Sequence, residues 1–293
     1  MKINTKKVQQ NFWGYFFVFP NIVGLLLFTV GPILAAVYFS FTEYSILQAP
    51  TWIGLENFKR LFADRLMWKS LKNTFYFAAL YVPLQTFSAL LVAVLLNQVT
   101  KGVKFFRTAF FIPTICSWIT VSLVWKWLLD PEAGWANSIL EMFSIPKSLW
   151  LFDERLVIPL LALIAVWKGI GYMMVIFLAA LQGVPKELYE AAEIDGANMR
   201  DRFWHITFPA VSPITMLVLL MSMIWAFQSF EQIYVMTSGG PENASLVTTL
   251  YLYNNAFNWY HMGYAASISW VLFLILLILM LMQMYLEKYW VKY

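Results

Sequence analysis

Charge, cysteine and histidine are all scarce in this chain of 293 residues. Only 12% of the residues are charged and 61% are hydrophobic, whereas soluble domains carry about 25% charged residues, so a water-soluble domain is excluded. The single cysteine, Cys116, excludes an internal disulfide framework and any site built from several cysteines. Because Cys116 lies in an apolar run, we expect a buried, unreactive thiol. The two histidines, His205 and His261, are too few and too far apart for a metal cluster.

The abundant residues are apolar, aromatic and weakly biased toward positive charge. Aromatic residues make up 18% of the chain, including 14 Trp and 15 Tyr, which suits a protein with many membrane–water interfaces. The net charge is +4. In so apolar a chain, basic loops on the cytoplasmic side of a membrane explain this excess, and we predict no nucleic-acid partner.

The apolar residues fall in continuous runs long enough to cross a bilayer, which takes about 20 residues. Continuous runs predict helices and not the alternating segments of a β-barrel. The sequence therefore predicts an all-α polytopic membrane protein that forms a single transmembrane domain over residues 1–293. The predicted spans cover residues 12–41, 74–96, 108–129, 157–181, 213–235 and 264–286.

The first span follows Lys2, Lys6 and Lys7, as in a secretory signal peptide. Its apolar stretch of roughly 30 residues exceeds the 7–15 of a signal core, so we expect an uncleaved anchor, bent at Gly31-Pro32. If both termini are cytoplasmic, the cytoplasmic loops carry somewhat more Lys and Arg than the external ones, and the last external segment, residues 236–263, carries none. We therefore expect both termini in the cytoplasm.

Residues 55–72 are an exception to the excess of Lys and Arg in cytoplasmic loops, because they are basic and would lie outside the membrane. Leu55, Phe58, Leu61, Phe62 and Leu66 have helical spacing, so we expect an amphipathic helix lying flat on the outer surface.

Residues 183–212, between the fourth and fifth spans, carry a specific pattern. Pro185 suits a first helical turn, and Glu187 and Glu190 follow where acidic side chains favour the helix dipole. Gly196 stands where a left-handed residue ends a helix. We expect a second short helix through Arg202, Phe203 and Ile206 up to Pro209, with Ser212-Pro213 as the start of the fifth span. The result is a stiff helix–turn–helix beneath the bilayer.

The string E-A-A-x-x-D-G-A, followed by F-x-x-I-x-F-P, resembles the EAA motif of permease subunits in binding-protein-dependent ABC importers. Phe208-Pro209 replaces the usual Leu-Pro of that motif. The matching positions are Glu190, Ala191, Ala192, Asp195, Gly196, Ala197, Phe203, Ile206, Pro209 and Pro213.

The resemblance extends over nearly the whole chain. The segments 17–24, 54–58 and 227–241, together with the residues around Thr248, Tyr253 and 263–266, are similar to the carbohydrate-uptake branch of these permeases. This branch implies a bacterial plasma-membrane location and a type I-like importer of sugars or oligosaccharides.

The resemblance also implies the assembly. Its partners are a second homologous permease, two ATP-binding subunits, an extracellular sugar-binding protein, the sugar and membrane lipid. The chain has no G-x-x-x-x-G-K-[ST] loop to cradle a phosphate, so ATP and Mg belong to the partner subunits and this chain binds no cofactor. In the family, the motif helix docks on the ATPase, which implies that residues 183–212, hereafter the coupling segment, receive its movement.

Polar and aromatic residues within the spans are candidates for the substrate path, because sugars offer C–H faces to rings and hydroxyls to amides and acids. Phe227-Gln228 is similar to a Phe–Asn pair that the maltose permease uses for its sugar. Lys168 lies mid-span, where a charge costs about 2.5 kcal/mol or more, so it should face a cavity or an acid such as Glu231. Interhelical hydrogen bonds are an alternative role for each residue. The candidates are Gln85, Trp125, Lys168, Tyr172, Phe227, Gln228, Glu231 and Tyr234.

Two other classes of membrane protein fit the sequence less well. A secondary transporter would carry acidic residues within its spans and inverted sequence repeats. Acidic residues are scarce in the spans of this chain, and no inverted repeat is visible. A membrane enzyme would need catalytic carboxylates in an external loop. Asp130, Glu132, Asp153 and Glu154 are available, but their spacing marks no reaction and solvation is the expected role.

Overall fold

The computed structural model describes the backbone of residues 5–98 and 102–291, and side chains from Trp13 onward within these ranges. The predicted all-α class is confirmed, since helices dominate and the described strands form one hairpin, β1 (Thr42–Ser45) and β2 (Gln48–Trp52). The chain divides into two compact units. The first comprises Met1–Ala63 with Leu252–Val271, and the second comprises Asp64–Tyr251 with Leu272–Tyr293.

Within the described residues, five helical stretches are long and apolar enough to cross a membrane, and a bent pair of helices makes up to six. The predicted spans 74–96, 157–181 and 264–286 lie inside observed helices, and 12–41 overlaps another. The five stretches are Trp13–Ser40, Arg65–Gln98 (α4), Val157–Gln182 (α8), Met199–Phe227 and Met262–Trp290 (α14).

The predicted span 108–129 corresponds to a bent pair of helices, because α5 (Val103–Ile115) and α6 (Trp118–Leu128) meet at 97°. Cys116 between them is extended, and the Ser117 side chain accepts the Ile119 N–H at 3.2 Å, which starts a new helix. Cys116 is exposed at this corner, so its predicted burial is also wrong.

The coupling segment also differs from expectation. Its first helix is α9 (Lys186–Ile194), but the next one does not stop at Pro209: α10 (Met199–Arg202), a π-helical turn (Phe203–Thr207) and α11 (Phe208–Phe227) are continuous. The N-cap is Asn198, which forms a capping box with Asp201. Ser212 is not an N-cap, because it lies inside α11. Its hydroxyl donates to the Pro209 carbonyl at 2.7 Å. This carbonyl lacks its helical partner, since residue 213 is a proline and has no N–H to donate.

The predicted span 213–235 differs from the observed helix at its C-terminal end. The α11 helix ends at Phe227, Phe230 has non-helical dihedrals, and α12 (Glu231–Met236) starts afresh. The freed backbone finds side-chain partners inside the second unit, since Thr249 donates to the Ser229 carbonyl. Broken helices within a membrane are tolerated where protein satisfies the backbone in this way.

The first unit contains α1 (Thr5–Leu25), a π-helical turn (Leu26–Val30), α2 (Gly31–Ser40), the hairpin and α3 (Glu56–Ala63). The amphipathic segment predicted over 55–72 is helical but divided, because α3 ends at Ala63 and α4 begins at Arg65. The Asp64 carboxylate then accepts the N–H groups of Leu66 and Met67 at 2.9 and 3.3 Å, which caps α4.

Asn57 of α3 ties this unit together. Its buried side-chain amide donates to the carbonyls of Ser40 and Thr42 at 3.0 and 2.9 Å, at the end of α2. We expect Asn57→Ala to leave two buried acceptors unpaired and to cost about 1–3 kcal/mol of stability. Thermal unfolding in detergent measures this loss, and an unchanged midpoint would contradict the assigned bonds. Asn258→Ala, which removes a side-chain bond to Asn254 at an exposed position of the same unit, is the matched control.

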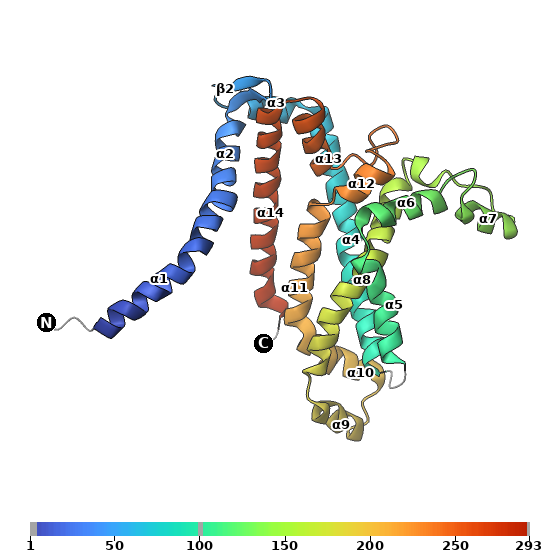
Figure 1. The fold of residues 1–293 in the computed structure, drawn as a ribbon. Helices are drawn as coiled ribbons and strands as arrows, with labels where there is room; N and C mark the ends of the chain where they lie inside the picture. The colour runs from blue at the N-terminus through green and yellow to red at the C-terminus, as the bar shows by residue number, and fades with distance from the viewer. Residues whose placement is uncertain (1–4, 99–101, 292–293) are drawn as a thin grey trace. The chain divides into compact units, whose positions relative to one another are not determined.

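The core of the second unit lies between α4, α8, α11 and α5, which run side by side (Figure 1). Ala89 and Ala93 of α4 are fully buried beside Met173 and Phe177 of α8. Small residues let helix backbones approach closely, which drives helix association in lipid. The remaining helices of this unit among the described residues are α7 (Trp135–Met142), a 3-10 turn (Trp150–Phe152) and α13 (Thr248–Tyr253). The last two residues of α13 belong to the first unit.

Candidate functional site

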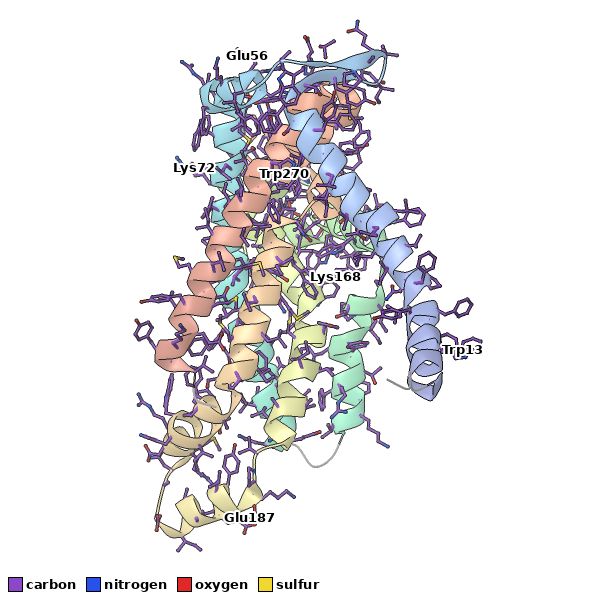
Figure 2. The ribbon with its side chains drawn as sticks, turned by 90° about the vertical axis from the view of Figure 1, so that its left-hand side faces the viewer. Trp13, Glu56, Lys72, Lys168, Glu187 and Trp270 are labelled. Carbon is purple, nitrogen blue, oxygen red and sulfur yellow. The ribbon has the colours of Figure 1, made fainter. Side chains whose placement is uncertain are left out.

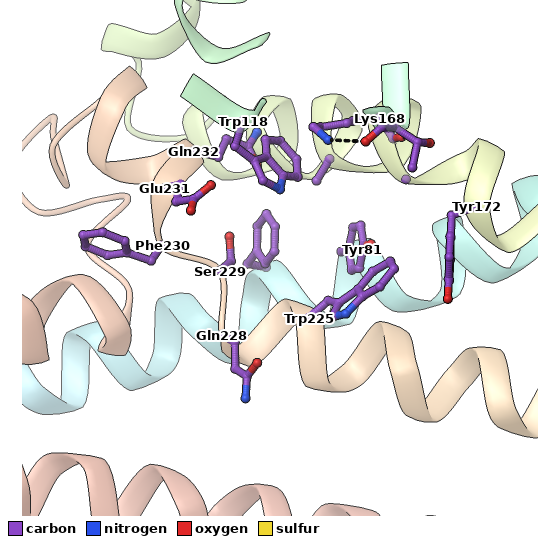
Figure 3. A pocket seen from close by; sticks show the side chains of 14 residues that line it. Tyr81, Trp118, Lys168, Tyr172, Trp225, Gln228, Ser229, Phe230, Glu231 and Gln232 are labelled. Carbon is purple, nitrogen blue, oxygen red and sulfur yellow. Dashed lines mark hydrogen bonds between the residues drawn. The ribbon is translucent and has the colours of Figure 1, made fainter. Parts of the chain in front are cut away.

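A cavity of about 450 Å³ lies inside the second unit, where the two broken spans meet α8 and α4 (Figure 3). We call it the central cavity. The corner between α5 and α6 forms one side and the break after α11 another. Its lining residues are Phe77, Tyr81, Thr114, Trp118, Ala165, Lys168, Gly169, Tyr172, Trp225, Gln228, Ser229, Phe230, Glu231 and Gln232.

The central cavity combines ring faces with hydrogen-bonding groups. Tyr172 and Trp225 lie with ring centroids 5.6 Å apart, and Phe77 stacks on Tyr81 at 5.7 Å. Amide, hydroxyl and charged groups stand among these rings. Sites of this kind bind ligands that offer C–H surfaces together with hydroxyls.

Lys168 is the buried cation of the central cavity, about midway along α8 (Figure 2). Its ammonium donates to the Thr114 carbonyl at 3.2 Å and lies 4.7 Å from the Trp118 ring centroid. The Thr114 hydroxyl donates in return to the Lys168 carbonyl at 2.9 Å. The ammonium thus neutralises the carbonyl end of α5, which explains how a charge is held at this depth.

Glu231 lines the same cavity as Lys168. The ion pairs found among the described residues do not include these two side chains, so the pair expected from the sequence is not formed in this structure.

Half of the substrate-path candidates line the central cavity and half lie elsewhere. Lys168, Tyr172, Gln228 and Glu231 are in its wall. The other four are not among its lining residues. Tyr234 stacks on the lining residue Phe230 at 5.4 Å, and Gln85 is buried beside the lining residue Gly169. Phe227 lies edge-on to Phe75 at 5.1 Å, and Trp125 contacts Trp167 at 5.6 Å.

Sequence reasoning missed Trp118, Trp225 and Tyr81. Helical spacing from the candidates could have found two of them, because Trp225 precedes Gln228 by three positions and Tyr81 precedes Gln85 by four. Trp118 offered no such signal, since its place depends on the bend after α5.

The coupling segment ends α9 with two backbone bonds. The Ala197 N–H donates to the Ala192 carbonyl at 2.8 Å and the Gly196 N–H to the Glu193 carbonyl at 3.1 Å. Gly196 has φ +79°, the left-handed conformation that such a helix end requires. The expected helix-ending conformation of Gly196 is confirmed.

The α9 helix is anchored at one side and free on the other. Tyr189 bonds the Thr207 hydroxyl at 3.1 Å, and Glu193 pairs with Arg202 at 3.2 Å. Glu190, Ala191 and Asp195 are exposed, and Ala192 and Ala197 are half-buried. Figure 2 shows Glu187 beyond the ends of the long helices of this unit. The motif residues Phe203, Ile206 and Pro209 are half-buried where the segment enters α11.

The carboxylates between α6 and α8 act in local turns. Asp130 accepts the N–H groups of Ala133 and Glu132, and these bonds hold its pKa below the usual value. Asp153 accepts the N–H groups of Arg155 and Leu156. Among the described residues, no cluster of three or more His, Cys, Asp or Glu side chains has metal-site geometry.

A cavity between broken membrane helices, together with an exposed short helix, α9, at one end of the unit, is the arrangement of a transport component. Residues 65–291 match the family described as binding-protein-dependent transport system inner membrane component, and the chain belongs to this family. It is thus a multi-pass inner-membrane component of a transport system and not an enzyme.

Individual relatives agree. The probable ABC transporter permease YesP of Bacillus subtilis is 39% identical, over 100% of this chain and 96% of its own. The arabinooligosaccharides transport permease AraP of the same organism is 36% identical, over 90% and 84%. The fold is shared with a bacterial alginate ABC transporter, solved in complex with alginate pentasaccharide-bound periplasmic protein, with TM-score 0.88, 22% identity and coverage of 98% of both chains.

Proposed function

We propose that this chain forms the translocation path of an ATP-driven importer of sugars or oligosaccharides. The observation that carries the proposal is the central cavity, which sets aromatic faces beside amide, hydroxyl and charged groups in the middle of the helical core. Relatives named for oligosaccharide transport, and the shared fold with an alginate transporter, support this substrate class.

The coupling segment meets the ATP-binding subunits in this proposal. A rigid helix transmits a partner's displacement as a body, and α9 is held rigid by its bonds to Thr207 and Arg202. Glu190 and Asp195 orient the docking by charge-assisted hydrogen bonds, and Ala191 and Ala192 permit close approach. ATP and Mg are bound by the partner subunits, a second homologous permease completes the path, and both termini of this chain are cytoplasmic.

Cross-linking tests this docking. In a Cys116→Ser background, Ala191→Cys in the assembled transporter should cross-link to single cysteines in the ATP-binding subunit, with yield that changes on ATP addition. Ser138→Cys in α7, at the other end of the unit, is the control and should give no product. Failure of Ala191→Cys to react with any ATPase position would refute the docking.

The rings of the central cavity are tested by Trp225→Leu. Loss of one aromatic face, about 1.4 kcal/mol of contact with the sugar, is expected to raise KM for uptake about tenfold. Trp127→Leu is the matched control, because Trp127 is exposed, packs on Trp135 and does not line the cavity. Equal KM values for the two variants in transport-saturation assays would contradict a sugar site here.

A further inference from the structure

A second hollow in the same unit has a different character. Its volume is about 980 Å³, and it lies between the inner half of α4, the end of α8 and the coupling segment. We call it the inner groove. Its lining residues are Phe87, Leu90, Leu91, Val94, Leu95, Asn97, Gln98, Leu181, Tyr189, Met199, Arg200, Arg202, Phe203, Trp204, Thr207 and Phe208.

The inner groove is polar at one end and apolar along the rest. On α4, Phe87, Leu91 and Leu95 repeat every fourth residue and are 63%, 46% and 54% exposed, so they form one uncovered stripe. At the end of α4 the lining changes to Asn97 and Gln98.

Two arginines line the polar end. Arg200 and Arg202 come from α10, and Trp204, 53% exposed, follows them. Trp side chains favour the headgroup level of a bilayer. Arg202 also pairs with Glu193 of α9, and Arg200 is exposed. The polar end therefore offers guanidinium donors to an anion, at the place where the apolar stripe stops.

The length of the apolar part fits one leaflet of a bilayer. From Phe87 to Gln98 a helix rises about 16 Å, at 1.5 Å per residue. Half of the hydrocarbon core is about 15 Å thick. An acyl chain lying on the stripe would thus bring its headgroup to the arginines.

We infer that the inner groove binds an anionic phospholipid, with its acyl chains on the α4 stripe and its phosphate at Arg200 and Arg202. Basic pockets between membrane helices on the cytoplasmic side bind such headgroups. The lipid joins α4 to α10 and lies against Tyr189 of α9, so its occupancy also stiffens the coupling segment. The cytoplasmic placement of this end rests on the proposed function.

Native mass spectrometry of the assembled transporter tests this site, with phosphatidylglycerol and phosphatidylcholine as probes. Wild-type protein should retain phosphatidylglycerol in preference to phosphatidylcholine. Arg200→Gln should weaken phosphatidylglycerol binding roughly fivefold, and Arg200→Gln with Arg202→Gln roughly thirtyfold. Leu91→Trp, which fills the stripe and leaves the charges, should also reduce binding.

A control separates the groove from its surroundings. Arg107→Gln removes a basic residue of α5 that does not line the groove. It should change phosphatidylglycerol binding by no more than about twofold. Because mass spectrometry reads the bound lipid directly, its result is independent of sugar uptake.

Three outcomes would overturn the inference. The first is equal phosphatidylglycerol binding by wild type and the double arginine variant. The second is displacement of the lipid by millimolar inorganic phosphate, which would indicate an anion site without acyl chains. The third is efficient cross-linking of Leu95→Cys, in the Cys116→Ser background, to the second permease, which would mean that protein fills the groove.

Discussion

Replacement of Gly196 by Val is expected to lower ATP-dependent uptake about tenfold or more while membrane insertion stays normal. Gly196 has φ +79°, where a residue with a Cβ pays roughly 1–2 kcal/mol and a β-branched residue more. This free-energy cost opposes the two backbone bonds that end α9, so the coupling segment loses the fixed shape that a partner surface requires. Uptake of labelled sugar and the amount of transporter in the membrane measure the two effects.

The control for Gly196 uses the open space around it. A Cβ built at Gly196 meets no atom within 4 Å, so only the backbone conformation opposes a side chain here. Asn tolerates the left-handed region, and Gly196→Asn should keep most of the uptake. If Gly196→Asn and Gly196→Val failed equally, the loss would come from the side chain itself and not from the helix end.

Replacement of Gly171 by Ala is expected to destabilise the second unit. A Cβ at Gly171 of α8 would lie 2.2 Å from the Phe110 carbonyl oxygen of α5, a backbone atom that cannot rotate away. The two helices would have to separate, at a cost of about 1–3 kcal/mol or more, which lowers the melting temperature by roughly 5 °C.

The same displacement should impair transport. Separation of α5 from α8 breaks the reciprocal bonds between Thr114 and Lys168, which form one wall of the central cavity. Gly14→Ala, in α1, is the matched control because no atom lies within 4 Å of its added Cβ. A Gly171→Ala transporter with normal melting temperature and uptake would contradict the close helix contact.

Features with a local cause could be predicted from the sequence. Continuous hydropathy located α8, since Val157–Gln182 carries one charge and no proline after its first turn. The end of α9 followed from Gly196 alone, because the left-handed conformation favours glycine whatever the surroundings.

Features that depend on three-dimensional context were missed. Hydropathy averages over a window, so it joined α5 to α6 and α11 to α12 across their breaks. The bend at Ser117 and the break at Phe230 are stable because Lys168 and Thr249 satisfy freed carbonyls, and neither residue is near them in sequence. The sequence therefore predicted only some of the residues that line the central cavity between these breaks.

Uptake into vesicles tests the central claim most directly. The chain is reconstituted with its second permease, ATP-binding subunits and sugar-binding protein, and labelled sugar is supplied on the binding-protein side. The account predicts accumulation only when ATP is present on the coupling-segment side and binding protein on the other. Accumulation driven by an ion gradient without ATP would contradict it, and would make the chain a secondary transporter.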